Sequence, residues 1–328
     1  MSLVRRRARI AAGLAMLLAV PAAPAQTPRN EPIEPLPTSV QLDAARVALG
    51  ERLFGDSRLS ASGQMSCAGC HRLDRAGADG RERSATNSGA PDQINTPTIF
   101  NVGFLYRFTW RGAFSSLAEQ AASVIANPRH MASTPQAAVA RISEDLGYRQ
   151  GFAQAYPGQG LTPTTLLDAL VNYERSLITP NARFDRWLRG EDAALDAREL
   201  RGYEKFKRFG CIACHQGQMI GGNVFARFGI FTPGPAQRSA APSGADLGRF
   251  MVTGREEDRF VYRVPSLRNV AETAPYLHDG SIARLKDVID EMAEHQLGRA
   301  LELEDVDDIH AFLQTLTGEF DGAMVSRR

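Results

Sequence analysis

Two short stretches decide the fold: CAGCH at residues 67–71 and CIACH at residues 211–215. Both have the pattern C-x-x-C-H, which is the attachment sequence of a c-type haem. On one helical turn, residues i, i+3 and i+4 share a face, so two thiols can bond to the haem vinyl groups while the histidine reaches the iron. The motifs contain all four cysteines of the chain: Cys67, Cys70, Cys211 and Cys214. The sequence therefore predicts two covalently bound c-type haems, with His71 and His215 as iron ligands.

Paired cysteines also occur in zinc sites and in thiol–disulfide exchange sites. A zinc site here would have to take its remaining ligands from a distant part of the chain. An exchange site would be expected within a βαβ pattern, which surrounds neither motif. Both alternatives are weaker than haem attachment, because both motifs carry the histidine.

The N-terminus predicts export. Four arginines at positions 5, 6, 7 and 9 precede a short apolar run at 10–20, and an A-x-A sequence ends at Ala25. This order is typical of a cleavable secretory signal peptide, here residues 1–25, and an uncleaved membrane anchor is the alternative. We expect a periplasmic protein. The chain of 328 residues has 43% hydrophobic and 23% charged residues, which indicates a globular protein. Its balanced charge gives no sign of nucleic-acid binding.

The hydrophobic periodicity predicts a mainly α protein, built as two cytochrome c-like haem domains with long loops. The expected domains are residues 26–180 and 181–328, each with one haem motif, and the boundary lies at Thr179-Pro180-Asn181. Residues 26–38 are expected to form an extended arm, residues 74–96 and 217–248 long loops, and residues 260–264 a short strand. Helices are expected at residues 40–54, 116–126, 135–146, 164–178, 197–209, 281–294 and 304–316.

The sixth iron ligands decide the chemistry, because a haem with an open position can bind a small molecule and a closed one carries electrons. Outside the motifs the chain has only His130, His278, His295 and His310. We expect His295 and His310 at the surface or at the boundary of the core. Met292 lies on an apolar helical face, and its spacing alone favours a core methionine over an iron ligand.

Several further short motifs are spread over nearly the whole chain. They are LGERLF (49–54), LS (59–60), NTPT (95–98), WRG (110–112), LAEQA (117–121), GGN (221–223), FG (228–229), VPSLRNV (264–270), PY (275–276) and HDG (278–280). By their order and spacing together, the chain resembles the bacterial diheme cytochrome c peroxidases and their MauG relatives.

The resemblance implies roles for individual residues. Met292 falls where these peroxidases place the axial methionine of the C-terminal haem, which would then relay electrons; MauG-type proteins have a tyrosine there. Trp110 matches the tryptophan between the two haems, whereas Trp187 has no such match and is expected in the core. The side chain of Asn95 and the backbone carbonyls of Thr273 and Pro275 match the family's calcium site, and oxygen ligands suit calcium.

Two positions depart from the family pattern near the N-terminal haem. Asn87 stands where many of these peroxidases have a histidine that caps the resting iron. Asparagine is a poor haem ligand, so we expect a haem that is open without reductive activation. The family also pairs a glutamine with a glutamate ten residues later, whereas this chain has Gln120 and His130.

Peroxide cleavage requires a proton to move between two oxygens, and an imidazole with a pKa of ~6.5 suits this task. We therefore hypothesise that His130 is the distal acid/base and that Gln120 orients the peroxide. His130 could instead ligate the iron, or simply pack against the haem edge.

The resulting prediction is an exported diheme peroxidase that reduces hydrogen peroxide to water. Its electrons would come from a small cytochrome c or copper protein. One alternative is a MauG-like oxidase that uses peroxide to modify tryptophan in a partner protein. The other is a non-catalytic diheme electron carrier. The resemblance also suggests a homodimer.

Overall fold

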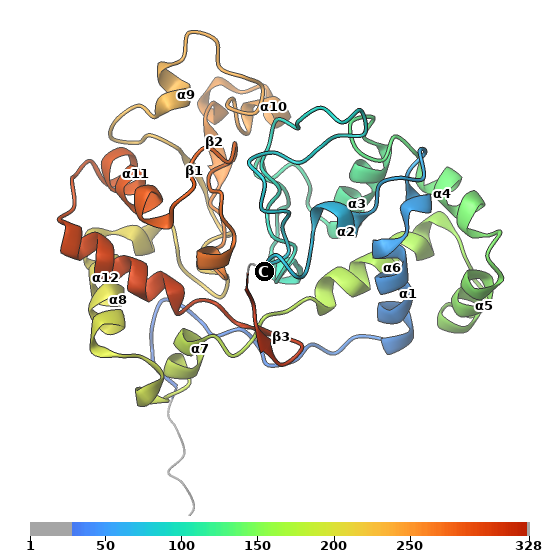
Figure 1. Ribbon diagram of the computed structural model, residues 1–328, viewed down its shortest axis with the longest axis horizontal. Helices are drawn as coiled ribbons and strands as arrows, with labels where there is room; N and C mark the ends of the chain where they lie inside the picture. The colour runs from blue at the N-terminus through green and yellow to red at the C-terminus, as the bar shows by residue number, and fades with distance from the viewer. Residues whose placement is uncertain (1–27, 327–328) are drawn as a thin grey trace, which may run out of the picture.

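The computed structural model describes residues 28–326 and is rich in helices (Figure 1). The predicted signal peptide lies outside the described residues. Within residues 28–326, every helix is too short or too polar to cross a membrane. The view in Figure 1 places α1 to α6 on one side and α7 to α12 on the other, with irregular segments between them. The prediction of a mainly α protein is therefore confirmed.

Residues 28–180 form six helices, several of which begin at side-chain caps. Asp43, Ser116, Thr134, Asp145 and Thr162 accept hydrogen bonds from backbone N–H groups in the first turns of their helices. These bonds satisfy donors that a helix start leaves free. The helices are α1 (Ala44–Gly55), α2 (Cys67–Cys70), α3 (Leu117–Ala126), α4 (Pro135–Ile142), α5 (Leu146–Ala155) and α6 (Pro163–Ser176).

Residues 181–326 add six more helices and two small antiparallel sheets. Strand β1 (Phe225–Arg227) pairs with β2 (Val261–Arg263), and β3 (Glu319–Phe320) pairs with β4 (Ala323–Met324). The helices are α7 (Arg183–Leu188), α8 (Ala197–Phe209), α9 (Pro235–Arg238), α10 (Phe250–Thr253), α11 (Leu285–Leu297) and α12 (Leu303–Gln314).

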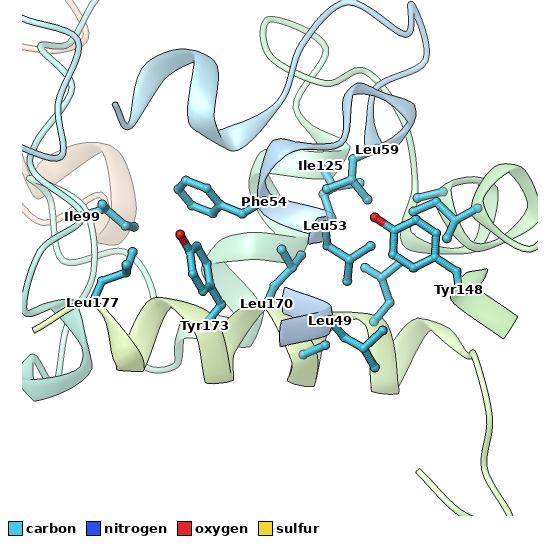
Figure 2. Packing of buried hydrophobic residues seen from close by; sticks show 14 of the residues in the cluster. Leu49, Leu53, Phe54, Leu59, Ile99, Ile125, Tyr148, Leu170, Tyr173 and Leu177 are labelled. Atoms are coloured by element: carbon cyan, nitrogen blue, oxygen red, sulfur yellow. The ribbon is translucent and has the colours of Figure 1, made fainter. Parts of the chain in front are cut away.

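Each half has its own hydrophobic core. The first contains residues between Leu49 and Leu177, and Figure 2 shows Phe54 beside Tyr173 and Leu53 near Leu170. The second contains residues between Phe184 and Leu316. Each core also contains a residue from the other half of the sequence: Ile33 packs in the second core and Val325 in the first. Two cores agree with a boundary near residue 180, while the division into two haem domains stays a prediction.

The two halves repeat the same helix pair, and a glycine sits at each crossing. A Cβ at Gly50 of α1 would lie 2.0 Å from the carbonyl oxygen of Ala169 in α6. A Cβ at Gly202 of α8 would lie 1.9 Å from that of Asp308 in α12. Only glycine allows backbones to approach this closely. The two halves thus share a helix pair that the faint similarity of their sequences does not indicate.

A second repeated element follows each haem motif and joins the halves. Asn101 and Asn269 both adopt a left-handed backbone, with φ of 63° and 60°, and each starts a short 3₁₀ helix. Their side-chain amides donate to the hydroxyl of Thr179, over 2.8 Å and 3.0 Å respectively. All three residues are buried. The predicted boundary therefore contains a buried polar contact that ties one repeat to the other.

Most predicted helices are present, with shifts at their ends. Helix α8 has the predicted bounds of 197–209. The predicted helix at 135–146 stops at Ile142, because Asp145 caps the separate helix α5. The predicted helix at 281–294 begins only at Leu285 as α11, because Ile282 is still bridged to Tyr276. The short strand expected at 260–264 is β2.

Candidate functional site

The two haem motifs have different local geometry. Residues Cys67–Cys70 form the helical turn α2, as the spacing predicts. The second motif forms a tighter 3₁₀ turn at Cys211–Ala213, which follows Gly210 at the left-handed end of α8. In both motifs the backbone N–H of the histidine donates to the carbonyl of the first cysteine, over 2.9 Å. Each histidine is thereby fixed at the end of its turn.

The imidazoles of His71 and His215 are held in the same way. Nδ1 of His71 lies 3.3 Å from the carbonyl oxygen of Gly77, and Nδ1 of His215 lies 3.4 Å from that of Ile220. A ring nitrogen that donates to a carbonyl leaves the other nitrogen unprotonated and able to bind a metal. Burial lowers the pKa of both rings, that of His215 to about 4. Both histidines are therefore suited to ligate through Nε2.

The alternative uses of the cysteines fit poorly. Within residues 28–326 the four cysteines form no disulfide, and burial raises the pKa of the Cys67 thiol to about 12 and that of the Cys211 thiol to about 11. Thiol–disulfide exchange needs a thiolate, which such thiols do not supply at neutral pH. In residues 28–326, the one group of three possible metal ligands is Asp246, His278 and Asp279, without a cysteine. A zinc site at the motifs has no support there.

Two arginines near the interface of the halves have no acidic partner among residues 28–326. Arg263 is only 6% exposed, and its guanidinium donates to the backbone carbonyls of Thr109 and Val264. Burial lowers its pKa to about 10. Arg111 is half-buried, and its Nε has no hydrogen-bond partner. A buried guanidinium calls for an anion. The carboxylates of haem propionates would satisfy this need, so the residues present fit the predicted cofactor.

Met292 lies on α11 and is partly buried. It belongs to neither hydrophobic core, whereas Ile289 and Val288 of the same helix contact the second core. Trp187 is buried in that core, as expected. The expectation that His295 lies at the surface or core boundary is wrong: it is 2% exposed, because its ring is held between Thr232 and Glu291. His310 is partly buried.

The residues expected at the distal side of the N-terminal haem come from α3 and the turn after it. Gln120 lies on α3 and is partly exposed, and its side chain forms no hydrogen bond within residues 28–326. His130 lies in the following turn, and its Nε2 is 2.8 Å from Oδ2 of Asp92. Burial is the main cause that lowers the pKa of His71, and the charge of His130 adds to it, so the two histidines interact electrostatically.

Asp92 is the residue at this site that the sequence did not reveal. It is 38 positions from His130 and belongs to the loop that contains Asn87. The guanidinium of Arg129 also binds Asp92, and the N–H of Asn87 donates to the carbonyl of Arg129 over 2.7 Å. Such a long-range pair has no signature in local spacing. The loop and the turn are nevertheless joined by several contacts, with the Asn87 side chain exposed.

Trp110 lies where the two halves meet. Its indole N–H donates to the carbonyl of Asn95 over 3.1 Å, and its own carbonyl accepts from the N–H of Arg263. The N–H of Asn95 donates to the carbonyl of His278. The Asn95 side-chain amide donates to the carbonyls of Arg81 and Glu82, which directs its oxygen away from them. Trp110 and Asn95 thus connect backbone from both halves.

The three oxygens of the expected calcium site are free of other partners. Within residues 28–326, neither the side-chain oxygen of Asn95 nor the carbonyl oxygen of Thr273 or Pro275 accepts a hydrogen bond. Asn95 is 6% exposed, and the two carbonyls belong to a turn around a cis Ala274–Pro275 bond. Oxygens without hydrogen donors are the kind of ligand that calcium takes.

The fold and the paired haem motifs define a class of protein, and sequence comparison agrees. The family model for the di-haem cytochrome c peroxidases matches residues 44–193. The chain is 39% identical to the cytochrome c551 peroxidase of Nitrosomonas europaea over 88% of this chain and 85% of that protein. The chain belongs to the di-haem cytochrome c peroxidase family, which confirms the resemblance found in its motifs.

Two further relatives extend this picture. The chain is 40% identical to the cytochrome c peroxidase Ccp of Escherichia coli over 92% of this chain, and it spans 64% of that protein. The crystal structure of a MauG-like protein associated with microbial copper homeostasis has a TM-score of 0.75 and 30% identity. The match covers 91% of this chain and 96% of the chain in that structure. The family confirms an oxidoreductase of the peroxidase type with haem cofactors.

Proposed function

We propose that this protein is an exported diheme peroxidase that reduces hydrogen peroxide to water with electrons from a small cytochrome c or copper protein. The observation that carries this proposal is the His130–Asp92 pair, which interacts electrostatically with His71. It supports a role for His130 as the proton-exchanging group near the first haem motif. Family membership supplies the reaction class.

The two haems would be held by the cysteines and histidines of their motifs, and when bound they supply the electron-transfer chemistry of peroxide reduction. Cys67, Cys70 and His71 would hold the N-terminal haem. Cys211, Cys214, His215 and Met292 would hold the C-terminal haem. Methionine ligation raises the reduction potential, which suits a relay.

The other site residues orient, connect and exchange protons. The amide of Gln120, which is free of other bonds, would hydrogen-bond to peroxide and orient it. His130 would accept a proton from one peroxide oxygen and return it to the other, which leaves as water. Trp110 would connect the two haem sites, because its hydrogen bonds join both halves of the chain.

A calcium ion would bind between the halves at Asn95, Thr273 and Pro275. The free oxygens described above support this site. We also propose that residues 1–25 direct export to the periplasm, that residues 26–180 and 181–328 are the two haem domains, and that the protein forms a homodimer like its family.

A MauG-like oxidase acting on tryptophan in a partner protein is the second candidate function. Asn87 at the position of the capping histidine favours it, as does the similarity to a MauG-like structure. Met292 at the position of the MauG tyrosine favours the peroxidase. A peroxide-dependent change in the mass of a partner protein, with negligible oxidation of reduced cytochrome c, would establish the oxidase instead.

A pure electron carrier requires both irons to be six-coordinate. His130 is the residue best placed to close the N-terminal site, but its Nε2 is bound by Asp92. This contact disfavours ligation through Nε2 and supports the acid/base role.

The direct test is steady-state peroxide reduction by the holoprotein with a reduced small cytochrome c as donor. We expect turnover by the wild type and a loss of ~10²–10⁴-fold in His130→Ala, the usual contribution of an acid/base group. An unchanged rate in His130→Ala would remove the assigned role. A wild type that does not react with peroxide in any redox state would reject the peroxidase itself.

A further inference from the structure

We infer that Asp92 is a positioning residue for the peroxide reaction: it fixes the ring of His130 so that Nδ1 is the atom that exchanges protons with the substrate. The inference rests on the proposed function and adds a residue to it. It follows from the way in which the loop around Asp92 and the turn around His130 are held together.

Both oxygens of the Asp92 carboxylate are engaged. Oδ1 accepts from the guanidinium of Arg129, over 3.2 Å and 3.3 Å, and from the N–H of Gln93 over 2.7 Å. Oδ2 lies 2.8 Å from Nε2 of His130. The side chain of Asp92 is 19% exposed and that of His130 is 31% exposed. The carboxylate is thus held in one orientation, with one oxygen presented to the imidazole.

The charge of Asp92 is also fixed. Burial alone would raise its pKa, but the hydrogen bonds from His130 and from the backbone of Gln93, together with the charges of His130 and Arg129, lower the pKa to about 2. Asp92 is therefore a carboxylate at any pH at which the protein would work. A carboxylate is an acceptor only, so Nε2 of His130 must carry the proton in this pair.

The tautomer decides which nitrogen can act as a base. With the proton on Nε2, a neutral His130 has its lone pair on Nδ1. Within residues 28–326, Nδ1 of His130 has no hydrogen-bond partner, so it is free to take a proton. The negative charge of Asp92 also stabilises the imidazolium that forms when it does. The same arrangement of carboxylate and histidine directs the base in other acid/base enzymes.

The proton step balances without any additional reagent. Nδ1 accepts the proton from one oxygen of hydrogen peroxide and becomes N–H. It then gives this proton to the second oxygen as the O–O bond breaks, and that oxygen leaves as water. The two electrons that reduce the peroxide, and the two protons that complete the second water, come from the donor protein and the solvent as in the proposed function. His130 ends in its starting tautomer.

Asp92 also has a purely structural role, which the test must distinguish from the positioning of His130. Together with Arg129 it holds the Asn87 loop against the 127–131 turn. If holding the loop were its whole role, replacing either partner would have the same effect. Arg129→Gln removes the contact to Oδ1 but leaves the bond between Asp92 and His130, so it is the matched variant for the structural role.

The experiment compares holoprotein variants in peroxide turnover and in cyanide association. Cyanide reaches a ferric haem mainly as HCN, which must give its proton to a base on binding, so its association rate reports the distal base without peroxidase turnover. We expect Asp92→Asn to lower both kcat for peroxide and the cyanide association rate by about 10- to 100-fold, as when a histidine loses its orienting carboxylate. The KM should change little, and Arg129→Gln should lose less than Asp92→Asn.

The double variant Asp92→Asn/His130→Ala separates positioning from a general structural effect. If Asp92 acts through His130, the double variant is no slower than His130→Ala alone. Asp74→Asn, which alters an exposed carboxylate paired with Arg72, is the control and should match the wild type.

Two results would overturn the inference. One is wild-type rates in Asp92→Asn, and the other is a double variant whose loss of rate equals the product of the losses of the two single variants. Failure of the proposed function would look different. The wild type would then lack turnover, while the cyanide association rates of the wild type and the same variants would still support or reject the role of Asp92.

Discussion

Glu174 on α6 offers a sharp test of how the first half of the chain is packed. Its carboxyl is 5% exposed, Oε2 has no hydrogen-bond partner, and burial raises its pKa to about 8. The negative charge of Glu174 contributes to the raised pKa of Cys67, which places this carboxyl close to the first haem motif. By the contacts of Gly50 and Gly202, the equivalent position of α12 is Leu313. One repeat thus buries a carboxyl where the other has leucine.

The sign of the effect follows from proton binding. The unfolded chain releases the Glu174 proton near pH 4.5, whereas the folded chain retains it up to about pH 8. Between these values the folded state binds more protons, so stability falls as the pH rises. Each unit of pKa difference corresponds to about 1.4 kcal/mol. Between pH 5 and pH 8, Glu174 should therefore cost the protein ~3 kcal/mol of stability, and Glu174→Gln should not show this loss.

The assay is denaturant unfolding of the holoprotein at pH 5 and pH 8. The free energy of unfolding of Glu174→Gln minus that of the wild type should rise by ~3 kcal/mol between the two pH values. Glu144→Gln, at an exposed position of the same half, is the control and should give the same difference at both. If Glu174→Gln behaves like this control, the carboxyl is solvated or paired, and the reasoning is refuted.

Three other changes test separate contacts. Gly202→Ala places a methyl group against the carbonyl of Asp308 and should cost ~1–3 kcal/mol in denaturant unfolding, whereas Gly55→Ala, which meets nothing within 4 Å, should cost little. Arg268→Met leaves the buried carboxylate of Asp185 without its 2.6 Å partner and should cost ~3–5 kcal/mol; a loss below 1 kcal/mol would show that the pair contributes little. Removal of calcium by a chelator should lower the thermal unfolding temperature of the wild type, and an unchanged temperature would argue against the site at Asn95.

The haem motifs and most helices were predictable because they depend on local spacing. Both C-x-x-C-H sequences and the apolar periodicity of α8 can be recognised within a few turns of chain. Helix α5 was missed because Gly147 and Gly151 lie in it and Asp145, which caps it, stands within what reads as one longer helix. The expected role of Met292 as an iron ligand was inferred from similarity to a family, since its spacing alone did not distinguish it from a core residue.

What the sequence did not show are contacts between distant segments. His295 is buried because Thr232, 63 positions away, holds its ring. The pairing of His130 with Asp92 depends on a loop folding back on a turn. The structural repeat was faint in sequence because many equivalent positions have different residues. Asn101 and Asn269 are identical, but the position equivalent to Glu174 is Leu313.

The central claim is that the two irons have unequal coordination, one open to peroxide and one closed by His215 and Met292. Electron paramagnetic resonance of the fully oxidised holoprotein tests it most directly, since it reports the spin state of each haem. We predict one high-spin signal, which His71→Ala perturbs, and one low-spin signal, which Met292→Ala perturbs. Two low-spin haems in every redox state, with no reaction with peroxide, would contradict the claim.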